Sequence, residues 1–289
     1  SSILPSTWVL PFYIGHAGGS LKWQAGNEIM ADMKIERVKA IATELYQAWK
    51  TGITLPHITD TFPDMTLEDA YAIQKEGIGM RIEAGERVIG AKIGLTSRAM
   101  MDLFQVYEPD YSLMTDSMVR SENEAISVKE FNLPMVEVEV AFLLKEDIQG
   151  PGVSEARVIS ATAGVLPSIE IIDTRYHQWS RSVICSVADL AGIRNIILGG
   201  RMTPLDGLDL RYVGMVFEKN GEIIDTAAGA AVMGNPVTSV AWLVNRLGCY
   251  GIGLHAGDIV MSGSLIRSVK IQAGDEVRGY FDRLGDVRT

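Results

Sequence analysis

The order of the hydrophobic patterns along the chain limits the possible folds more than any single motif does. Between residues 33 and 85, apolar side chains recur at three- and four-residue steps, which is typical of helices that pack on one side. After residue 86, the apolar segments are rich in β-branched residues and bounded by Gly or Pro, which is typical of strands. These strands do not alternate regularly with helices, which counts against a Rossmann sheet or a TIM barrel, so we expect an α+β fold with a large, rolled or mixed β core and a smaller N-terminal helical part. The expected strands are 87–96, 136–144, 166–172, 193–198, 210–219, 222–226, 258–262 and 269–281.

Three short signals place individual elements. Thr66, followed three residues later by Asp69, is a weak capping box and predicts the start of a helix. Asn220-Gly221 between two apolar segments is a strong signal for a β-hairpin. A further helix is expected after Pro236, with Gly248 at its end.

Residues 1–32 differ from the rest of the chain. Their apolar stretch is interrupted by prolines and has no basic flank, unlike a secretory signal. Met30 or Met33 would make a natural beginning. We therefore expect an atypical extension at 1–32, a helical part at 33–86 and a catalytic β-roll domain at 87–289.

The charge balance and the cysteines exclude several functional classes. The chain has 26 Lys and Arg against 36 Asp and Glu, a net charge of −10 that repels nucleic-acid phosphates. No apolar run approaches the roughly 20 residues that span a bilayer. Cys185 and Cys249 are the two cysteines of the chain and have no metal-type spacing, which indicates reduced thiols and a cytoplasmic protein. Nucleic acids and membranes are therefore not expected as partners.

The segment 134–144 carries the first chemical signal. Side chains alternate between the two faces of a strand, so Glu137 and Glu139 point the same way, about 7 Å apart along the strand, while Val138 faces away. Two carboxylates side by side in apolar surroundings repel each other and lose hydration, so they need a cation or a shared proton. The alternative is an outward acidic face on an edge strand.

A second acidic residue pattern weakens that alternative. Glu170 lies in the middle of another apolar strand, where a lone charge is costly. Three carboxylates without cysteine or a nearby histidine favour a hard cation, Mg²⁺ or Mn²⁺, over zinc.

Lys92 is expected on one strand face together with Gly90 and Gly94. Glycines beside a lysine leave room for something to approach the ammonium group closely, such as an anionic substrate or a group that exchanges a proton with it. The alternative is a solvent-facing lysine on a glycine-rich strand.

Other motifs fit their usual context badly. The run 251–256 matches a dinucleotide fingerprint formally, but it follows a helix and leads into a strand, the reverse of the required order. The chain has no Gly-x-Ser-x-Gly elbow, so a hydrolase triad has no anchor. The four histidines are scattered without ligand spacing.

These residues together resemble the fumarylacetoacetate hydrolase superfamily, in particular its hydratase and decarboxylase branch. The resemblance extends from about residue 60 to residue 284, which is most of the chain. The segments that carry it are Tyr71-Ala72-Ile73-Gln74, 90–97, Glu108-Pro109-Asp110-Tyr111, Val136-Glu137-Val138-Glu139, 167–173 and Gly229-Ala230-Ala231-Val232.

The resemblance implies the fold of that family, with a rolled, mixed β core, and a role for eight residues. It implies Mg²⁺ or Mn²⁺ as the cofactor. The implied metal ligands are Glu137, Glu139 and Glu170, the implied acid–base residues are Lys92 and Asp110, and the expected substrate contacts are Leu95, Thr96 and Ser264.

The implied activity is the hydration of 2-hydroxypenta-2,4-dienoate, a small 2-oxo/2-hydroxy-dienoic acid, to 4-hydroxy-2-oxopentanoate in the catabolism of aromatic compounds. Two alternatives stay open: decarboxylation of 4-oxalocrotonate, and a non-catalytic subunit that stabilises a partner enzyme. The family also implies a homo-oligomer and an association with a pathway partner enzyme.

Four positions depart from the family pattern. Leu190, Gly192 and Asn235 stand where asparagine, serine and histidine are frequent, and Ser112 replaces a glycine. Leu190 removes a polar side chain, so this departure is expected to affect the substrate pocket and motivates the non-catalytic alternative.

Overall fold

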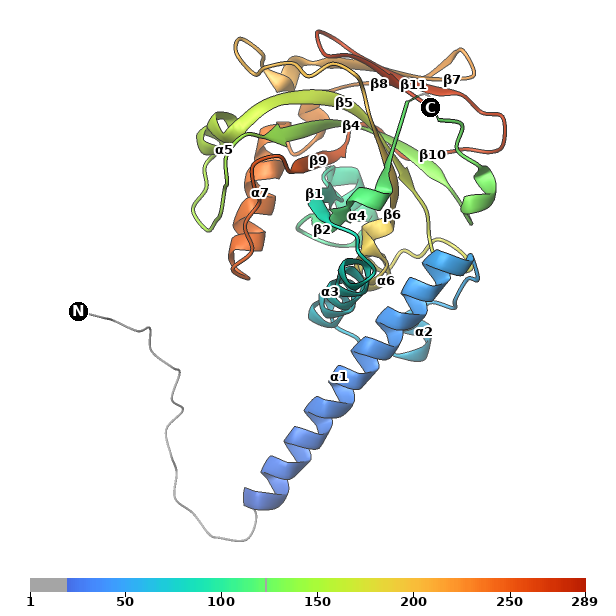
Figure 1. Cartoon of the computed structure of the whole chain (residues 1–289), viewed down its shortest axis with the longest axis vertical. Coiled ribbons are helices and arrows are strands. Elements are labelled where there is room, and N and C mark those ends of the chain that lie inside the picture. Colours follow the sequence, from blue (N-terminus) through green and yellow to red (C-terminus); the bar gives the residue numbers. More distant parts are fainter. Residues whose placement is uncertain (1–19, 123) are drawn as a thin grey trace, which may run out of the picture.

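A computed structural model of the protein describes residues 20–122 and 124–289. Three helices precede the first strand and lie together below the β-sheets in the view of Figure 1: α1 (Ser20–Thr51), α2 (Ile58–Thr61) and α3 (Leu67–Glu83). Of the predicted extension at 1–32, residues 1–19 lie outside the described residues and 20–32 belong to α1.

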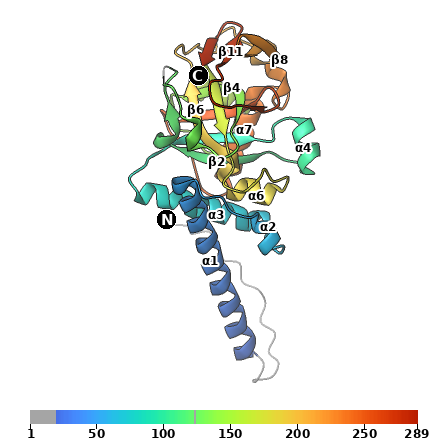
Figure 2. The same ribbon diagram turned by 90° about the vertical axis from the view of Figure 1, so that its right-hand side faces the viewer.

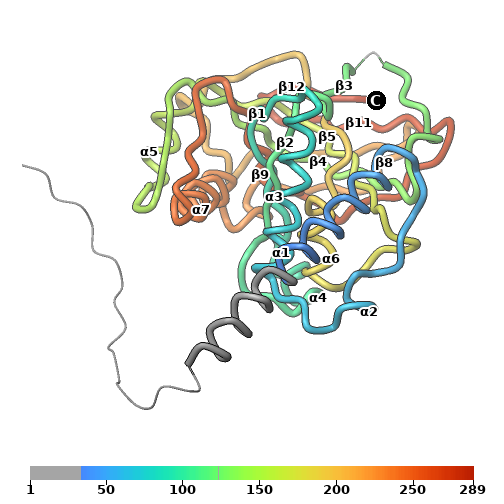
Figure 3. The backbone as a smooth tube through the Cα atoms, turned by 60° about the horizontal axis from the view of Figure 1, so that its bottom comes forward, coloured from blue at the N-terminus to red at the C-terminus, as the bar shows by residue number. Residues whose placement is uncertain are grey.

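The helical part has an apolar core of its own. Val38, Ile41 and Leu45 of α1 are buried, as their spacing predicts, and they share a cluster with Ile73 of α3. This cluster also includes residues of α6 (Val183–Ala188), which lies beside α1 and α3 (Figure 3). Two details differ from the apolar pattern that starts at residue 33: the helix already begins at Ser20, and Ile35, which the pattern places on the buried face, is 53% exposed.

The three short sequence signals are confirmed. Thr66 and Asp69 form a reciprocal capping box at the start of α3. Asn220 and Gly221 take positive φ values of 56° and 80° in the turn between β7 (Gly214–Lys219) and β8 (Glu222–Ala228), as a two-residue hairpin requires. Helix α7 (Pro236–Gly248) has proline in its first turn.

Two sheets form the β core. The larger has the order β2-β1-β9-β4-β5-β6-β3 with β10 paired to β4, and the smaller has the order β12-β11-β7-β8. The remaining strands are β1 (Val88–Gly94), β2 (Asp110–Thr115), β3 (Val119–Arg120), β4 (Met135–Leu144), β5 (Thr162–Ile172), β6 (Ile193–Leu198), β9 (Ile259–Ser264), β10 (Val269–Lys270), β11 (Val277–Phe281) and β12 (Gly285–Arg288).

Some expected elements differ in extent. The strand expected at 210–219 starts as a 3₁₀ turn and becomes β7 only at Gly214. The strand expected at 269–281 is broken into β10 and β11 by a loop. The sequence patterns missed β2, β3, β12, α2, α6 and two further short helices, α4 (Arg98–Phe104) and α5 (Glu155–Ala161).

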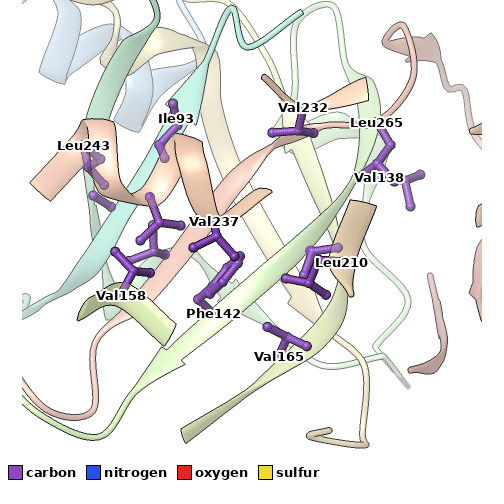
Figure 4. Packing of buried hydrophobic residues seen from close by; sticks show 14 of the residues in the cluster. Ile93, Val138, Phe142, Val158, Val165, Leu210, Val232, Val237, Leu243 and Leu265 are labelled. Atoms are coloured by element: carbon purple, nitrogen blue, oxygen red, sulfur yellow. The ribbon is translucent and has the colours of Figure 1, made fainter. Parts of the chain in front are cut away.

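The main hydrophobic core lies on one face of β4 and β5. Val138 and Phe142 of β4 are fully buried there, and Figure 4 shows Val237 of α7 beside Phe142. Val277 and Phe281 of the smaller sheet belong to the same cluster. Because the valines of β4 fill this face, the strand presents its two glutamates on the opposite one.

Strand pairing gathers distant parts of the chain at that opposite face. β4 pairs antiparallel with both β5 and β9, and β9 pairs in parallel with β1, so segments near residues 92, 139, 170 and 263 become neighbours. Within residues 20–122 and 124–289, no helix is both long and apolar enough to cross a bilayer.

Candidate metal and substrate site

The three acidic residues expected to hold a metal lie on the paired strands β4 and β5. Glu137 is directly opposite Glu170 in the register, and Glu139 is opposite Ser168. One carboxylate oxygen from each glutamate lies within 4.8 Å of the others. Strand alternation and register therefore bring together the three residues that the sequence singled out.

The described protein groups satisfy these carboxylates only in part. The backbone N–H of Gly263 donates a hydrogen bond to Glu139 Oε2 at 2.8 Å, and Lys92 Nζ lies 3.4 Å from Glu170 Oε1. Glu139 Oε1 and both carboxylate oxygens of Glu170 are buried and accept no hydrogen bond from the described residues. Since burying a carboxylate without partners is costly, these orphaned oxygens call for a positive partner. An all-oxygen donor set of this kind fits a hard divalent cation.

Burial raises the pKa of all three glutamates, and repulsion within the cluster adds to the rise at Glu137 and Glu139. Loss of hydration, followed by the charge of Glu170, raises the pKa of Glu137 to about 8 although Lys92 opposes the change. Burial, Glu170 and Glu137 raise the pKa of Glu139 well above its usual range. Burial also raises the pKa of Glu170, again against the effect of Lys92. Protonation of the cluster is therefore favoured when no cation is bound, and a divalent cation would compete with those protons.

Lys92 brings a positive charge to the cluster from β1. Its side chain is buried, with 3% of the residue exposed, so the alternative of a solvent-facing lysine was wrong. Burial alone lowers the pKa of Lys92, but the charges of Glu170 and Asp110 outweigh it and the pKa rises. The ammonium group is therefore charged at physiological pH.

Asp110 is the first residue of β2 and pairs with Gly94 of β1. Its Oδ2 accepts a hydrogen bond from Ser186 Oγ at 3.4 Å, whereas its Oδ1 is buried and has no hydrogen-bond partner among the described residues. Burial raises the pKa of Asp110, and Lys92 and Ser186 oppose the rise. Asp110 therefore has one oxygen held by Ser186 and one oxygen without a hydrogen-bond partner among the described residues.

Gly94 keeps open the space that Lys92 and Asp110 share. A Cβ atom built on Gly94 would lie 2.2 Å from Asp110 Oδ1 and 3.4 Å from Lys92 Nζ. The Asp110 carboxyl group and the Lys92 ammonium group thus border the same space beside Gly94, and any residue larger than glycine would fill that space. The close approach inferred from the glycines beside Lys92 is found here.

A cavity of about 300 Å³ opens beside these groups. Met100, Leu103 and Phe104 of α4 give it an apolar wall, and Figure 2 shows α4 standing out from the body of the molecule. Of the residues singled out from the sequence, those lining the cavity are Lys92, Leu95, Thr96, Asp110, Glu137 and Ser264. Glu139 and Glu170 are fully buried and meet Glu137 in the carboxylate cluster.

Each of the three expected substrate contacts is held in place by a local feature of the fold. Leu95 has a φ of 56°, in the left-handed region that side chains other than glycine rarely adopt. Thr96 follows it, and a Cβ on Gly263 would lie 2.3 Å from Thr96 Oγ1, so the two segments pack closely. Ser264 donates its hydroxyl to the carbonyl of Ile266 at 2.8 Å.

Several cavity residues escaped sequence reasoning. Ser186, Trp179, Arg181 and Arg267 all line the cavity, but none of them belongs to a local pattern with a chemical meaning. Ser186 lies next to the segment 187–192, whose departures from the family pattern had drawn attention, and that proximity was the available signal.

The expected effect of Leu190 on the substrate pocket is not found. Leu190 is buried in an apolar cluster with Ile78 and Met261 and does not line the cavity, whereas Ala191 does. The cluster explains why an apolar side chain suits position 190. Two of the other departures have local roles: Asn235 caps α7, and the Ser112 hydroxyl donates a hydrogen bond to the carbonyl of Leu113.

The mixed β core and the buried acidic cluster at its cavity define an α+β protein organised around a carboxylate centre. The sequence model described as fumarylacetoacetate (FAA) hydrolase C-terminal matches residues 96–289. The chain is 41% identical over 243 residues to a 2-hydroxyhexa-2,4-dienoate hydratase of Comamonas testosteroni, covering 83% of this chain and 92% of that protein. It is 42% identical over 216 residues to a 2-hydroxypent-2,4-dienoate hydratase of Pseudomonas putida, covering 74% and 97%. The chain belongs to the fumarylacetoacetate hydrolase family.

A solved structure agrees with the fold. The 4-oxalocrotonate decarboxylase from Pseudomonas putida G7, complexed with magnesium and adipate, superposes with a TM-score of 0.85 and is 36% identical. The match covers 88% of this chain and 96% of that one. The expected α+β fold of the fumarylacetoacetate hydrolase type is thereby confirmed.

Proposed function

We propose that the protein is a metal-dependent hydro-lyase that converts 2-hydroxypenta-2,4-dienoate and water into 4-hydroxy-2-oxopentanoate. The observation that carries the proposal is the cluster of Glu137, Glu139 and Glu170, three carboxylates that share one nearby ammonium group, Lys92, and lie beside a cavity with acid–base groups. The names of relatives at 41% and 42% identity, both hydratases of short dienoates, support the same reaction class.

In this proposal the three glutamates hold a divalent cation, Mg²⁺ or Mn²⁺. Such a cation supplies Lewis-acid chemistry that stabilises negative charge on the carboxylate and 2-oxygen of a bound substrate. The magnesium in the structure of the decarboxylase from Pseudomonas putida G7 favours Mg²⁺.

Lys92 and Asp110 are the proposed acid–base pair. Ketonisation of the dienol moves a proton from its 2-hydroxyl group to the end of the conjugated chain, and water then adds across the remaining double bond. Asp110 Oδ1 suits the proton transfer because it is unpartnered and because burial raises the pKa of the carboxyl group towards the working range. Lys92 stays charged and would donate a hydrogen bond to the developing oxyanion.

The cavity would exclude bulk water from the intermediate. The apolar wall from α4 and the buried positions of Thr96 and Asp110 leave little room for side reactions with solvent. Leu95, Thr96 and Ser264 are the proposed substrate contacts on this cavity.

A second candidate is the decarboxylation of 4-oxalocrotonate. The structural likeness to the decarboxylase from Pseudomonas putida G7 favours it, and loss of CO₂ would use the same stabilised enolate. The non-catalytic alternative lost its motivation when Leu190 proved to lie in the core and away from the cavity.

The proposal also includes a homo-oligomer, an association with a pathway partner enzyme and a cytoplasmic location. The location is supported by the two cysteines, Cys185 and Cys249, which are both free thiols.

The test is an assay of the purified full chain with 2-hydroxypenta-2,4-dienoate and with 4-oxalocrotonate, each with Mg²⁺ and after treatment with EDTA. Loss of the dienol absorbance without CO₂ release is expected, with a decrease of at least about a hundredfold when the metal is removed. CO₂ release from 4-oxalocrotonate at the higher rate would favour the second candidate instead. Absence of turnover of both substrates in protein that binds Mg²⁺ would contradict both.

A further inference from the structure

A second cavity, of about 200 Å³, opens where the helical part meets the large sheet. Its walls include residues of α1, α3, β3 and β6, and it shares no lining residue with the cavity beside the glutamates. Among the described residues that line it, Glu86 is the only acid. We call it the basic cavity, because its lining includes four cationic side chains: Lys50, Arg81, Arg120 and Arg194.

The four cations differ in how far the protein neutralises them. Arg81 and Arg120 have carboxylate partners at 3.3 Å or less. Lys50 and Arg194 form no ion pair with the part of the chain that the structure describes, and the Lys50 ammonium group lies 5.4 Å from the ring centroid of Tyr46. In a chain with net charge −10, two cations without a carboxylate beside one cavity indicate a place for an anion.

Arg194 is held in position by groups that carry no full charge. Its Nη1 donates to the carbonyl of Trp49 and its Nη2 to the carbonyl of Glu130, both at 3.2 Å, and its guanidinium group lies 4.1 Å from the ring centroid of Trp49. Burial, together with the charges of Arg175 and Arg81, lowers the pKa of Arg194 to about 10, although nearby carboxylates oppose the change. The group therefore stays charged near neutral pH, in surroundings that an anion would make more favourable.

Two polar atoms of the lining residues have no hydrogen-bond partner among the described residues. Asn195 is 4% exposed, and its Nδ2 donates to the carbonyl of Met118 at 3.1 Å, whereas its Oδ1 is buried and accepts no hydrogen bond. Arg120 Nε is likewise buried and donates none. Since buried polar atoms are nearly always paired, the walls of the basic cavity have one unused acceptor and one unused donor beside the unpaired cations.

The unmatched groups define the chemistry of the ligand. Cations and a guanidinium N–H call for negatively charged oxygens, whereas Asn195 Oδ1 needs a hydrogen-bond donor. Near neutral pH, inorganic phosphate offers both, because it carries negative oxygens and keeps at least one O–H group. Sulfate and carboxylates have no proton to donate at this pH. The volume of about 200 Å³ lies below the roughly 300–1,000 Å³ of pockets for drug-sized ligands, so a free ion suits the cavity better than a larger phosphate ester.

We propose that the basic cavity binds inorganic phosphate, with Lys50 and Arg194 neutralising its charge and Asn195 Oδ1 accepting a hydrogen bond from its O–H group. Arg120 Nε donates to one of the phosphate oxygens. Because Lys50 belongs to α1 and Arg194 to β6, bound phosphate links the helical part to the sheet and stabilises the fold. The site is separate from the carboxylate cluster and does not depend on the proposed function.

Calorimetry on the full chain with Mg²⁺ tests the site through the dissociation constants of phosphate and sulfate at equal ionic strength. Phosphate is expected to bind at least about tenfold more tightly, because sulfate leaves Asn195 Oδ1 without a donor. Phosphate should also raise the melting temperature above that in chloride of equal ionic strength.

The double variant Lys50→Gln/Arg194→Gln removes both unpaired cations, so its affinity for phosphate should fall by at least about thirtyfold. Arg194→Gln also removes the hydrogen bonds to two carbonyls, which could disturb folding. The single variant Lys50→Gln avoids this difficulty because Lys50 is exposed. Its affinity for phosphate should fall by at least about threefold.

The matched control is Lys39→Gln/Arg201→Gln, which changes the net charge by the same amount at exposed positions that do not line the basic cavity. It should keep the wild-type affinity for phosphate. Equal affinities of phosphate and sulfate, or the same loss of affinity in the control as in the double variant, would overturn the site. Phosphate bound at the glutamate cluster would survive both the single and the double substitution, and that result would overturn the site as well.

Discussion

Two groups of buried charges in this protein have opposite surroundings. Arg175 and Asp189, each 4% exposed, pair with each other, and the N–H of Arg175 also donates to Asp189 Oδ2 at 2.9 Å. The guanidinium group of Arg175 lies 4.9 Å from the ring centroid of Trp49. Around the carboxylate cluster, by contrast, Glu137, Glu139 and Glu170 share one nearby cation, Lys92, and three of their buried oxygens accept no hydrogen bond from the described residues.

The difference separates a structural role from a binding role. A buried ion pair that satisfies itself needs nothing from solution, and removing one partner leaves an uncompensated charge. A buried cluster with surplus charge of one sign lowers stability until a ligand neutralises it, which is the usual sign of a functional site. Substitutions in the two groups should therefore have opposite effects on stability and activity.

The largest effect is expected from Glu139→Gln in the carboxylate cluster. The change removes one charged ligand, so metal-dependent turnover should fall by about a thousandfold or more, because a bound cation contributes several kcal/mol to catalysis. The melting temperature of the metal-free protein should stay equal or rise, since a neutral amide removes the cost of burying the Glu139 carboxylate. Turnover assays and thermal melts are the measurements, with the exposed Glu146→Gln as the control. Turnover like that of wild type would remove the proposed role of Glu139.

The next effect is expected from Asp189→Ala in the satisfied pair. This substitution leaves Arg175 buried without its carboxylate and should destabilise the fold by about 3–5 kcal/mol. The loss of stability is measured by urea unfolding, as a decrease of the midpoint concentration at an unchanged m-value. A loss below about 1 kcal/mol would show that Arg175 finds another partner, and would contradict a structural role for the pair.

The smallest effect concerns pH. The pKa of Glu137 is raised from 4.5 to about 8 in the folded, metal-free protein, so the folded state binds a proton that the unfolded state releases. Stability is then fully present at low pH and decreases as the pH rises from about 4.5 to 8. Mg²⁺ removes this penalty by displacing the proton, so the increase in melting temperature on adding Mg²⁺ should be larger by a few degrees at pH 8.5 than at pH 5.5. Thermal melts at both pH values check this, and an increase that shrinks with pH would contradict it.

The alternation of side chains along the strands made the acidic cluster predictable. Which other strands lie next to it could not be predicted from the sequence. Glu137 and Glu139 share a face because of a period of two, and the apolar strand around Glu170 indicated a second buried acid. Whether the two strands pair, and in which register, depends on long-range contacts that no local pattern encodes. The parallel pairing of β1 with β9 is of the same kind, and it brings Lys92 opposite Met261.

The short helices and the loop residues of the cavity could not be predicted from the sequence, for a different reason. Helix α4 has seven residues and α6 has six, too few for a hydrophobic period to be recognised. Arg181 and Arg267 are ordinary loop arginines in the sequence, and only the fold places them on one cavity. The burial of Lys92 was likewise undecided until the sheet order placed β1 between β2 and β9.

The cross-strand register of Glu137 and Glu170 also restricts how the chain length can change in evolution. Inserting or deleting one residue within β4 or β5 would turn every later side chain of that strand to the other face, and a glutamate would replace a core valine or isoleucine. The connection between the strands, residues 145–161, carries no such restriction because it carries none of the three glutamates. In homologous sequences, insertions and deletions in the region from β4 to β5 should therefore be confined to that connection.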